Sequence, residues 1–566
     1  MILIFISWIY ILFTTINLGF LTDRILQLKN QNFTITSILG LFATTIIASI
    51  WAIFGRINIE FNVFLLLLNI FISLRFKDEI IAIYKMVLSQ FKELPNILKI
   101  VFVITTLLII AQCSSIPFII DNESYYIQTI KWINEYGFVK GLANLHLFLG
   151  QTSGWHVTQS VFNFSFLYKN FNDLSGYCLL LGSFFSIQKL NDFYTNNNKN
   201  YLVAGLFPLF NIFLFQFISA PSPDVPVYVF STILFFYFLE NFKKPTPEVF
   251  YLIVILVLFL IYIKNTMLTF AIIPIILLTL HFKPLSKKLL KPVLLTILVI
   301  SLFIIKNMII CGSPIFPSKS FSNLSTVYAI PDAIESFYYD SIKHFGYSVT
   351  AQQYNSMSSF NLFLKWLTLP KLHGLFNLLS VFLVIFVPFF IYKFQNRKSL
   401  WALYIVMVLQ LLLLFVTSPQ YRFFMNFIIF FSLFCLSCLI QNKKTINFIL
   451  TLSLIPVFII LFFPLNFNSF SNNPFMRKSS NFNFKNIVFA YKNTKNNTDF
   501  IIVKLGNLNY NSPVNNDFFW GNGDGDLPCV NKDQIEYFKK YFNTIPQMRT
   551  NDLKDGFYAK KLSENE

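Results

Sequence analysis

Residues 99–123, KIVFVITTLLIIAQCSSIPFIIDNE, join a long apolar run to two acids. The run at 99–117 is long enough to cross a membrane as a helix, since about 20 residues span roughly 30 Å of hydrocarbon. Asp121 and Glu123 follow shortly after its end. This junction predicts a transmembrane helix that brings two carboxylates to a membrane surface.

The composition of the whole chain is that of a membrane protein. Of its 566 residues, 55% are hydrophobic and 12% are charged, whereas about 25% of a typical soluble domain is charged. The recurring apolar runs predict an all-α polytopic bundle of about 14 transmembrane helices. We expect these spans at 1–20, 34–55, 60–74, 99–117, 173–190, 201–219, 225–240, 249–264, 267–282, 292–311, 374–393, 399–417, 422–440 and 446–463.

The net charge of +18 does not indicate a nucleic-acid partner. Proteins that bind nucleic acid gather Lys and Arg on one face or stripe, but here these residues punctuate the connections between apolar runs. This pattern is typical of the excess of Lys and Arg in cytoplasmic loops. We therefore expect membrane lipids, and no nucleic acid, as partners.

The basic clusters fall in alternate connections, which makes those connections cytoplasmic. The loops at 118–172 and 312–372 then face outward, together with the segment 464–566. That last segment has alternating apolar stretches followed by a helical pattern. We predict a transmembrane bundle at 1–463 and a small outward α+β domain at 464–566.

The outward loop at 118–172 contains a helical pattern of its own. Tyr126, Ile130 and Ile133 recur at helical spacing, and Gly137 supplies a stop. This predicts a helix in the membrane interface, with aromatic side chains at headgroup level. Because long loops with their own structure are more often functional, we expect the active site here.

Three outward acids are candidates for catalysis. Asp121 and Glu123 follow the apolar run described above, and Asp224 stands in SAPSPDVP before another span. A carboxylate at this boundary can accept a proton from an attacking hydroxyl. The structural alternative for an Asp at the start of a helix is an N-cap.

The same acids are where a divalent metal would bind, but no cofactor is assigned. GNGDGD at 521–526 has the first spacings of a calcium loop, yet Leu527 occupies the position that requires Gly. This stretch is interpreted as a turn. The six Cys lie mostly in apolar segments without paired metal-site spacing.

Arg422 in SPQYRF stands at the outward start of one span, and Lys306 lies near the outward end of another. The ordinary role of a cation at such a place is to reach the lipid headgroups. A guanidinium also fits a phosphate through two parallel hydrogen bonds. For a lipid-phosphate substrate, Arg422 is the first choice to hold the phosphate and Lys306 the second.

Tyr126, His146 and His156 are candidates for substrate contacts in the same loop. Either histidine has the chemistry to assist proton transfer or bind a metal, although their spacing is not a ligand signature. The alternative for each is a hydrogen-bonding residue at the interface. Soluble-nucleotide chemistry is disfavoured, because no nucleotide-binding motif occurs in a supporting context.

Four motifs, in this order, resemble those of the GT-C superfamily of integral-membrane glycosyltransferases. They are DNE at 121–123, SAPSPDVP at 219–226, GSPIFPS at 312–318 and SPQYRF at 418–423. They are similar, respectively, to the loop acid, the second acid before a span, a proline-rich turn and an arginine-containing turn. One difference is that three extra spans precede the acidic loop here, whereas that loop follows the first span in many members.

The resemblance implies an enzyme that moves a sugar from a polyprenyl-phosphate donor to a glycan, lipid or protein acceptor, with inversion at the sugar. It implies Asp121 or Glu123 as the base, Asp224 as a second acid and Arg422 as the donor-phosphate contact. It also implies the bacterial cytoplasmic (inner) membrane, with the site and the C-terminus facing the periplasm.

Three alternatives remain open. An O-antigen-type polymerase or ligase also takes lipid-linked glycans at the outward face, and relies on Arg rather than on a loop acid. A transporter or lipid-glycan flippase acts without catalysis, but transporters tend to have repeated halves and midplane polar residues, and no repeat is evident here. The third alternative is a non-catalytic envelope scaffold that acts through the C-terminal segment.

Overall fold

The structure is a computed structural model of the chain. The residues that it describes are 1–168, 171, 173–317, 326–395, 397–463, 465–466, 482–491, 494, 498–514 and 518–563. Part of the predicted outward loop, including Ser318 of GSPIFPS, lies outside the described residues, as does part of the predicted outward domain.

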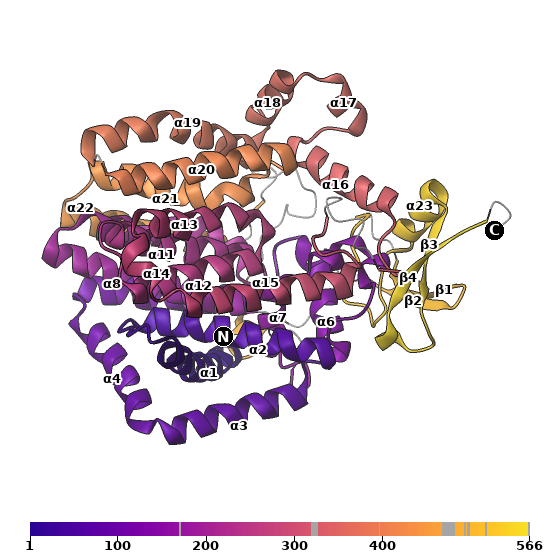
Figure 1. Ribbon diagram of the computed structural model, residues 1–566, viewed down its shortest axis with the longest axis horizontal. Helices are drawn as coiled ribbons and strands as arrows, with labels where there is room; N and C mark the ends of the chain where they lie inside the picture. Colours follow the sequence, from indigo (N-terminus) through magenta and orange to yellow (C-terminus); the bar gives the residue numbers. More distant parts are fainter. Residues whose placement is uncertain are drawn as a thin grey trace.

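Most of the chain folds into helices that lie side by side along the length of the molecule (Figure 1). The first half contains α1 (Ile2–Leu26), α2 (Phe33–Phe54), α3 (Ile59–Arg75), α4 (Lys77–Glu93), α5 (Asn96–Cys113), α6 (Ile127–Tyr136), α7 (Gly154–Val161), α8 (Leu174–Asn196), α9 (Lys199–Gly205), α10 (Asn211–Leu214), α11 (Asp224–Asn241) and α12 (Pro247–Ile263). The second half contains α13 (Ile272–Leu280), α14 (Phe282–Ser286), α15 (Leu290–Cys311), α16 (Asp332–Tyr347), α17 (Ala351–Ser356), α18 (Ser359–Leu367), α19 (Lys371–Phe394), α20 (Lys398–Thr417), α21 (Tyr421–Leu439) and α22 (Lys443–Phe462).

Nine helical segments within the described residues are long and apolar enough to cross a membrane. They are α1, α2, α5, the segment Lys199–Phe217, α15, α19, α20, α21 and α22. The pair α3 and α4, bent by 93°, adds a tenth if it counts as one span. The chain is therefore a multi-pass membrane protein.

The predicted count of about 14 spans is not confirmed. The expected spans at 173–190 and 225–240 correspond to α8 and α11, whose residues are mostly buried inside the protein. Those at 249–264 and 267–282 form shorter helices, separated at Lys264. The count of about 14 therefore stays a prediction, while nine or ten spans are supported by length and composition within the described residues.

The helices α1 and α2 approach each other closely at Gly19 and Gly40. A Cβ atom on Gly19 would lie 1.9 Å from the carbonyl oxygen of Thr36, and one on Gly40 would lie 1.9 Å from that of Thr15. Small residues allow membrane helices to pack at this distance and to gain van der Waals contact. These two glycines therefore set the spacing of the first two helices.

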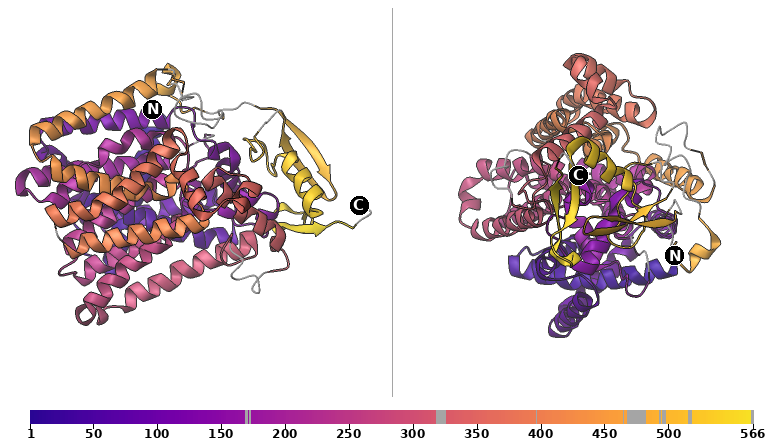
Figure 2. Two further views of the ribbon diagram at one scale, coloured as in Figure 1. Left: turned by 90° about the horizontal axis from the view of Figure 1, so that it is seen from above. Right: turned by 90° about the vertical axis from the view of Figure 1, so that its right-hand side faces the viewer.

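The C-terminal residues form a small α+β region at one end of the bundle (Figure 2). Its elements are β1 (Phe500–Leu505), β2 (Leu508–Pro513), α23 (Lys532–Phe542), β3 (Thr544–Met548) and β4 (Phe557–Lys561). Strands β1 and β2 form one antiparallel pair, and β3 and β4 form another. The predicted combination of helix and strand in this part of the chain is confirmed.

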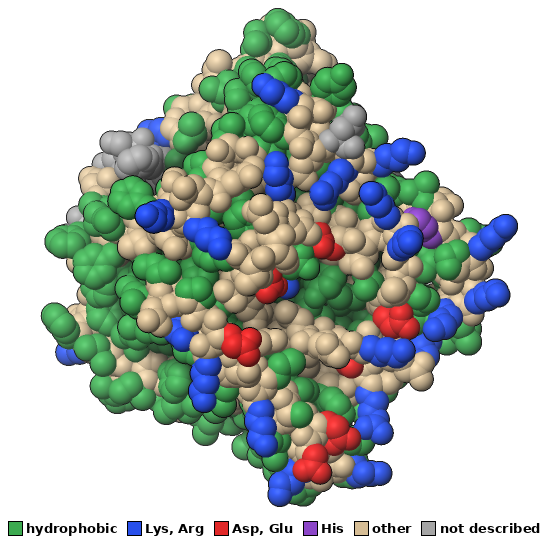
Figure 3. Space-filling model, turned by 90° about the vertical axis from the view of Figure 1, so that its left-hand side faces the viewer, with side chains coloured by type: hydrophobic (Ala, Val, Ile, Leu, Met, Phe, Trp, Pro, Cys, Tyr) green, Lys and Arg blue, Asp and Glu red, His purple; other side chains and the backbone are tan. Residues whose placement is uncertain are grey.

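The opposite end of the bundle is rich in Lys and Arg side chains (Figure 3). The connections on that side include the exposed residues Lys283, Lys287, Lys398 and Lys443. The two ends of the molecule therefore differ, because one is basic and the other carries the C-terminal region.

Candidate functional site

The site starts where the chain leaves α5 and enters the predicted outward loop. Asn122–Tyr126 form a short π-helix, η1, which continues directly into α6. We name residues 121–126 the acidic turn, because Asp121 precedes η1 and Glu123 lies within it. Single π-helical turns are rare in proteins, and those that occur often lie at functional sites.

Asp121 forms an ion pair with Arg422, the second residue of α21. The guanidinium Nη1 donates to Oδ2 of Asp121, and Nε donates to Oε1 of Gln420 at 3.2 Å. The backbone oxygen of Arg422 accepts a hydrogen bond from the hydroxyl of Tyr228 in α11, at 2.8 Å. Arg422 thus joins the acidic turn to the starts of α21 and α11.

Asp224, the first residue of α11, forms a second ion pair with Lys264, the residue after α12. Its carboxylate is almost fully buried, at 2% exposure, so the lysine charge compensates a carboxylate that water hardly reaches. The described residues show no capping hydrogen bond from the side chain of Asp121 or Asp224. The N-cap alternative is therefore unsupported for both.

Phe423 connects the two ion pairs. Lys264 Nζ lies 4.4 Å from the centre of its ring, and Arg422 Cζ lies 5.2 Å from the same point. Both distances are within the range of a cation–π interaction. The structure thus brings Asp121, Asp224 and Arg422 into one cluster, and Lys264 is its fourth member.

Tyr125 and Tyr126 are buried beside this cluster. Burial raises the pKa of both hydroxyls, and the Asp121 carboxylate raises each pKa further, while Arg422 opposes this effect. Both phenols therefore remain protonated near neutral pH and keep a hydrogen-bond donor. Tyr126, a predicted substrate contact, is 1% exposed and lies against His156 with ring centres 4.8 Å apart.

Glu123 is buried, at 7% exposure. Its backbone oxygen accepts hydrogen bonds from the amides of Asn522 and Gly523 in the C-terminal region, at 3.0 and 2.9 Å. Glu123 is therefore held by a distant part of the chain. The neighbouring pair Ser124 and Asn522 is separated by 398 positions.

The two histidines are buried, at 2% exposure for His146 and 0% for His156. Burial lowers the pKa of each to about 3, and the Lys306 charge contributes to lowering that of His156. Nδ1 of His146 accepts from the amide of Phe148 at 3.1 Å, and Nδ1 of His156 accepts from that of Ser153 at 3.3 Å. These contacts favour the hydrogen-bonding alternative for both residues.

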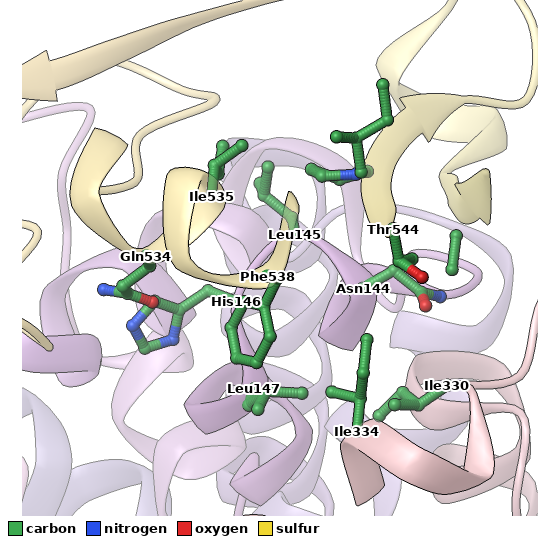
Figure 4. A pocket seen from close by; sticks show the side chains of 13 residues that line it. Asn144, Leu145, His146, Leu147, Ile330, Ile334, Gln534, Ile535, Phe538 and Thr544 are labelled. Atoms are coloured by element: carbon green, nitrogen blue, oxygen red, sulfur yellow. The ribbon is translucent and has the colours of Figure 1, made fainter. Parts of the chain in front are cut away.

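His146 also lines a small cavity between the loops at 118–172 and 312–372 and the C-terminal region (Figure 4). Asn144, Ile334 and Phe538 contribute further side chains from three different parts of the chain. The cavity measures about 20 Å³, which is about the room that one water molecule needs. It is too small for a sugar, so the charged cluster is the better candidate site.

Lys306 lies apart from the two ion pairs. Its side chain is buried, at 3% exposure, and its ammonium donates to the backbone oxygen of Thr152. The rings of Phe303 and Tyr262 lie 5.4 and 6.0 Å from Nζ. In the part of the chain that the structure describes, no carboxylate pairs with Lys306.

The sequence leaves a divalent metal at the loop acids open, and the described residues show no ligand set for one. Among the described residues, no three His, Cys, Asp or Glu side chains gather as metal ligands. Asp121 and Asp224 each face a cation instead. A metal would have to displace Arg422 or Lys264 to bind these carboxylates.

Lys264 and the C-terminal segment belong to the site but are not among the residues that the sequence predicts for it. Lys264 is a lone cation between two apolar runs, and an ionisable residue in such a place is a default functional candidate. That rule was sufficient to select it. No comparable local signal marks residues 520–525 as neighbours of the acidic turn.

The fold and the cluster define a multi-pass helical membrane protein with paired charges at the ends of its helices. The chain belongs to a family described as a domain of unknown function, DUF8201, whose model matches residues 1–429. The match includes Asp121, Asp224, Lys264 and Arg422, and it ends before the C-terminal region. No curated protein and no solved structure matches the chain.

Proposed function

We propose that the protein is a glycosyltransferase of the GT-C type, which moves a sugar from a polyprenyl-phosphate donor to an acceptor at the outer face of the membrane. The observation that carries this proposal is the pairing of Asp121 with Arg422 and of Asp224 with Lys264 around Phe423. Four distant segments of a membrane protein thus bring acids and cations to one cluster.

The cations suit the phosphate of the donor. The planar guanidinium of Arg422 can hold two phosphate oxygens at once. Lys264 adds a second positive charge, 4.4 Å from the centre of the Phe423 ring, and Lys306 is a further buried cation that lies apart from the two ion pairs. Cations in a site with little water stabilise the negative charge that develops on a departing lipid phosphate.

The carboxylates suit the acceptor. When the donor phosphate binds Arg422, it replaces the Asp121 carboxylate in the ion pair. Asp121 is then free to accept the proton of the acceptor hydroxyl. The hydroxyl oxygen forms its bond to the anomeric carbon while the bond from that carbon to the phosphate oxygen breaks, and the lipid phosphate leaves with the electron pair. General-base catalysis of this kind contributes about 10²–10⁴-fold.

Glu123 is the alternative base, because it belongs to the same turn. Asp224 has a different part, which is to hold Lys264 at the site through their ion pair. A direct displacement of this kind inverts the configuration at the sugar. If a divalent metal takes part, its binding requires one of the two ion pairs to open.

The distribution of charge supports the proposed orientation. The basic end of the bundle (Figure 3) corresponds to the cytoplasmic side by the excess of Lys and Arg in cytoplasmic loops. The cluster and the C-terminal region then face the periplasm of a bacterial inner membrane. A lipid-linked sugar reaches the cluster there from the outer leaflet.

The proposal is tested by comparing lipid-linked and surface glycans in cells with and without the protein. We expect a polyprenyl-phosphate sugar to accumulate in its absence, and the wild-type chain to reverse this. Unchanged lipid-linked and surface glycans would contradict the proposal. Activity that survives loss of Asp121, Glu123 and Asp224, but not loss of Arg422, would instead favour a polymerase or ligase.

A further inference from the structure

Residues 520–525, WGNGDG, form a turn that lies on the acidic turn, and we name it the C-terminal turn. Besides the two amides that bind the backbone oxygen of Glu123, it makes two contacts to Ser124. Ser124 Oγ donates to the backbone oxygen of Trp520 at 3.0 Å, and Asn522 Nδ2 donates to that of Ser124 at 2.7 Å. Glu123 and Ser124, the two residues directly after Asn122 in η1, are therefore held by the C-terminal turn.

The first turns of α6 are held by the same segment. Gln128 Nε2 donates to the backbone oxygens of Gly523 and Gly525, each at 3.0 Å. Lys131 Nζ donates to those of Asp524 and Gly525, at 2.9 and 3.0 Å, and forms an ion pair with the Asp524 carboxylate. Two polar side chains of α6, Gln128 and Lys131, are therefore held by the C-terminal turn.

The glycines of the C-terminal turn give it this shape. Gly523 has a φ of +69°, which favours glycine over any other residue. A Cβ atom on Gly525 would lie 2.7 Å from Cys529 Sγ and from the ring of Phe500. The carbonyl oxygens of both glycines point toward α6, where they accept hydrogen bonds from Gln128 and, for Gly525, also from Lys131.

We propose that the C-terminal turn positions Asp121 and Glu123 for the reaction, with Gln128, Lys131 and Asn522 as the positioning residues. The effect on the reaction rests on the proposed function. The holding of the acidic turn by the C-terminal turn does not. A π-helix has a disturbed ladder of backbone hydrogen bonds, and external partners fix its geometry. A small displacement of a catalytic group lowers the rate of reaction strongly.

The positioning role predicts a split between kinetic constants. Lys131→Met and Gln128→Leu leave Arg422 and Lys264 in place, so the KM for the donor stays close to that of the wild type. The kcat falls by about tenfold or more, because the carboxylate no longer meets the acceptor hydroxyl. Lys131→Arg keeps the charge and a donor, and it retains most of the wild-type kcat.

Hydrogen exchange on the full-length protein in detergent tests the holding directly. We expect the amides of 121–131 to exchange about tenfold faster in Lys131→Met and Gln128→Leu than in the wild type, because local opening becomes easier. Lys540→Met is the control, since Lys540 is exposed on α23. It should leave exchange in 121–131 unchanged.

Unchanged exchange in 121–131 overturns the inference. Faster exchange with an unchanged kcat overturns the positioning role, since the acids then tolerate the motion. If the wild-type protein transfers no sugar, the proposed function fails by itself, and the exchange experiment still decides whether the C-terminal turn holds the acids.

Discussion

Asp121 and Arg422 lie 301 positions apart in the chain, and their side chains form a direct ion pair at the N-terminal end of α21. The carboxylate is 16% exposed and the guanidinium 29%, so the pair is partly shielded from water. Removing one partner leaves a poorly solvated charge, whereas removing both does not. This difference separates the contribution of the pair to folding from its contribution to chemistry.

Asp121→Asn and Arg422→Gln should each lower the free energy of unfolding by about 1–3 kcal/mol and reduce sugar transfer by about 100-fold or more. The double variant should regain much of the stability but none of the transfer. Thermal unfolding in detergent and transfer from a lipid-linked donor measure the two quantities.

The matched control is the ion pair of Arg56 and Glu60, whose side chains are 44% and 50% exposed. Neutralising both should change stability by less than about 1 kcal/mol, because exposed pairs contribute little. Wild-type transfer by the Asp121→Asn, Arg422→Gln double variant would rule out the catalytic assignment.

Lys306→Met should raise the KM for the lipid-linked donor by about tenfold, since a bidentate or ionic phosphate contact contributes on the order of 1.4 kcal/mol. The fold should tolerate this change, because Met replaces a buried cation with an apolar chain of similar length. Lys343→Met is the control, since Lys343 has no proposed substrate contact and its Nζ lies 5.0 Å from the centre of the Tyr354 ring. An unchanged KM in Lys306→Met would remove Lys306 from the site.

Acid should destabilise the protein through His146 and His156. Burial holds each pKa at about 3 in the folded state, below an unfolded value of about 6.5. The unfolded state therefore binds protons first, and stability is lost as the pH falls from about 6.5 toward 3, by up to about 1.4 kcal/mol per pH unit for each histidine.

This pH dependence can be followed by thermal unfolding between pH 7.5 and pH 5. His156→Gln should show a shallower loss of stability than the wild type, because Gln does not titrate. Identical pH profiles for the two proteins would mean that His156 is not the group that takes up the proton.

Gly40→Ala should destabilise the protein by about 1–3 kcal/mol, since the added methyl group forces α1 and α2 apart. Gly55→Ala is the matched control, because a Cβ atom there would approach only Trp51 Nε1, at 3.8 Å. Five of the six cysteines are buried, so a thiol-reactive dye can report unfolding. Equal stability of the two variants would contradict the close approach of α1 and α2.

The sequence indicated the membrane bundle, the helix after Tyr126 and its end at Gly137, because apolar periodicity and a helix-stopping glycine are local signals. The structure confirms α6, which ends at Tyr136, and finds Gly137 at a φ of +76°. The number of spans, about 14, stays a prediction, because nine helical segments within the described residues are long and apolar enough to cross a membrane and α8 and α11 are not among them.

The candidate site could be predicted in part. Asp121, Asp224 and Arg422 can be recognised because each stands at the end of an apolar run. An ionisable residue in such a place is a candidate for a functional role. Their partners cannot be recognised in this way, because a pair such as Asp224 and Lys264 depends on how distant helix ends meet. Gln128 and Gly523 of the C-terminal turn are separated by 395 positions. Neither local sequence contains a pattern that predicts their contact.

The contacts of the C-terminal turn also order events in time. The ribosome makes the acidic turn long before Asn522 and Gly523, because 398 positions separate Ser124 from Asn522. Until Asn522 and Gly523 are in place, the backbone oxygen of Glu123 lacks these two hydrogen bonds. Chains that are still being synthesised thus carry an incompletely held acidic turn, and these contacts are complete only after the C-terminal region has folded against it.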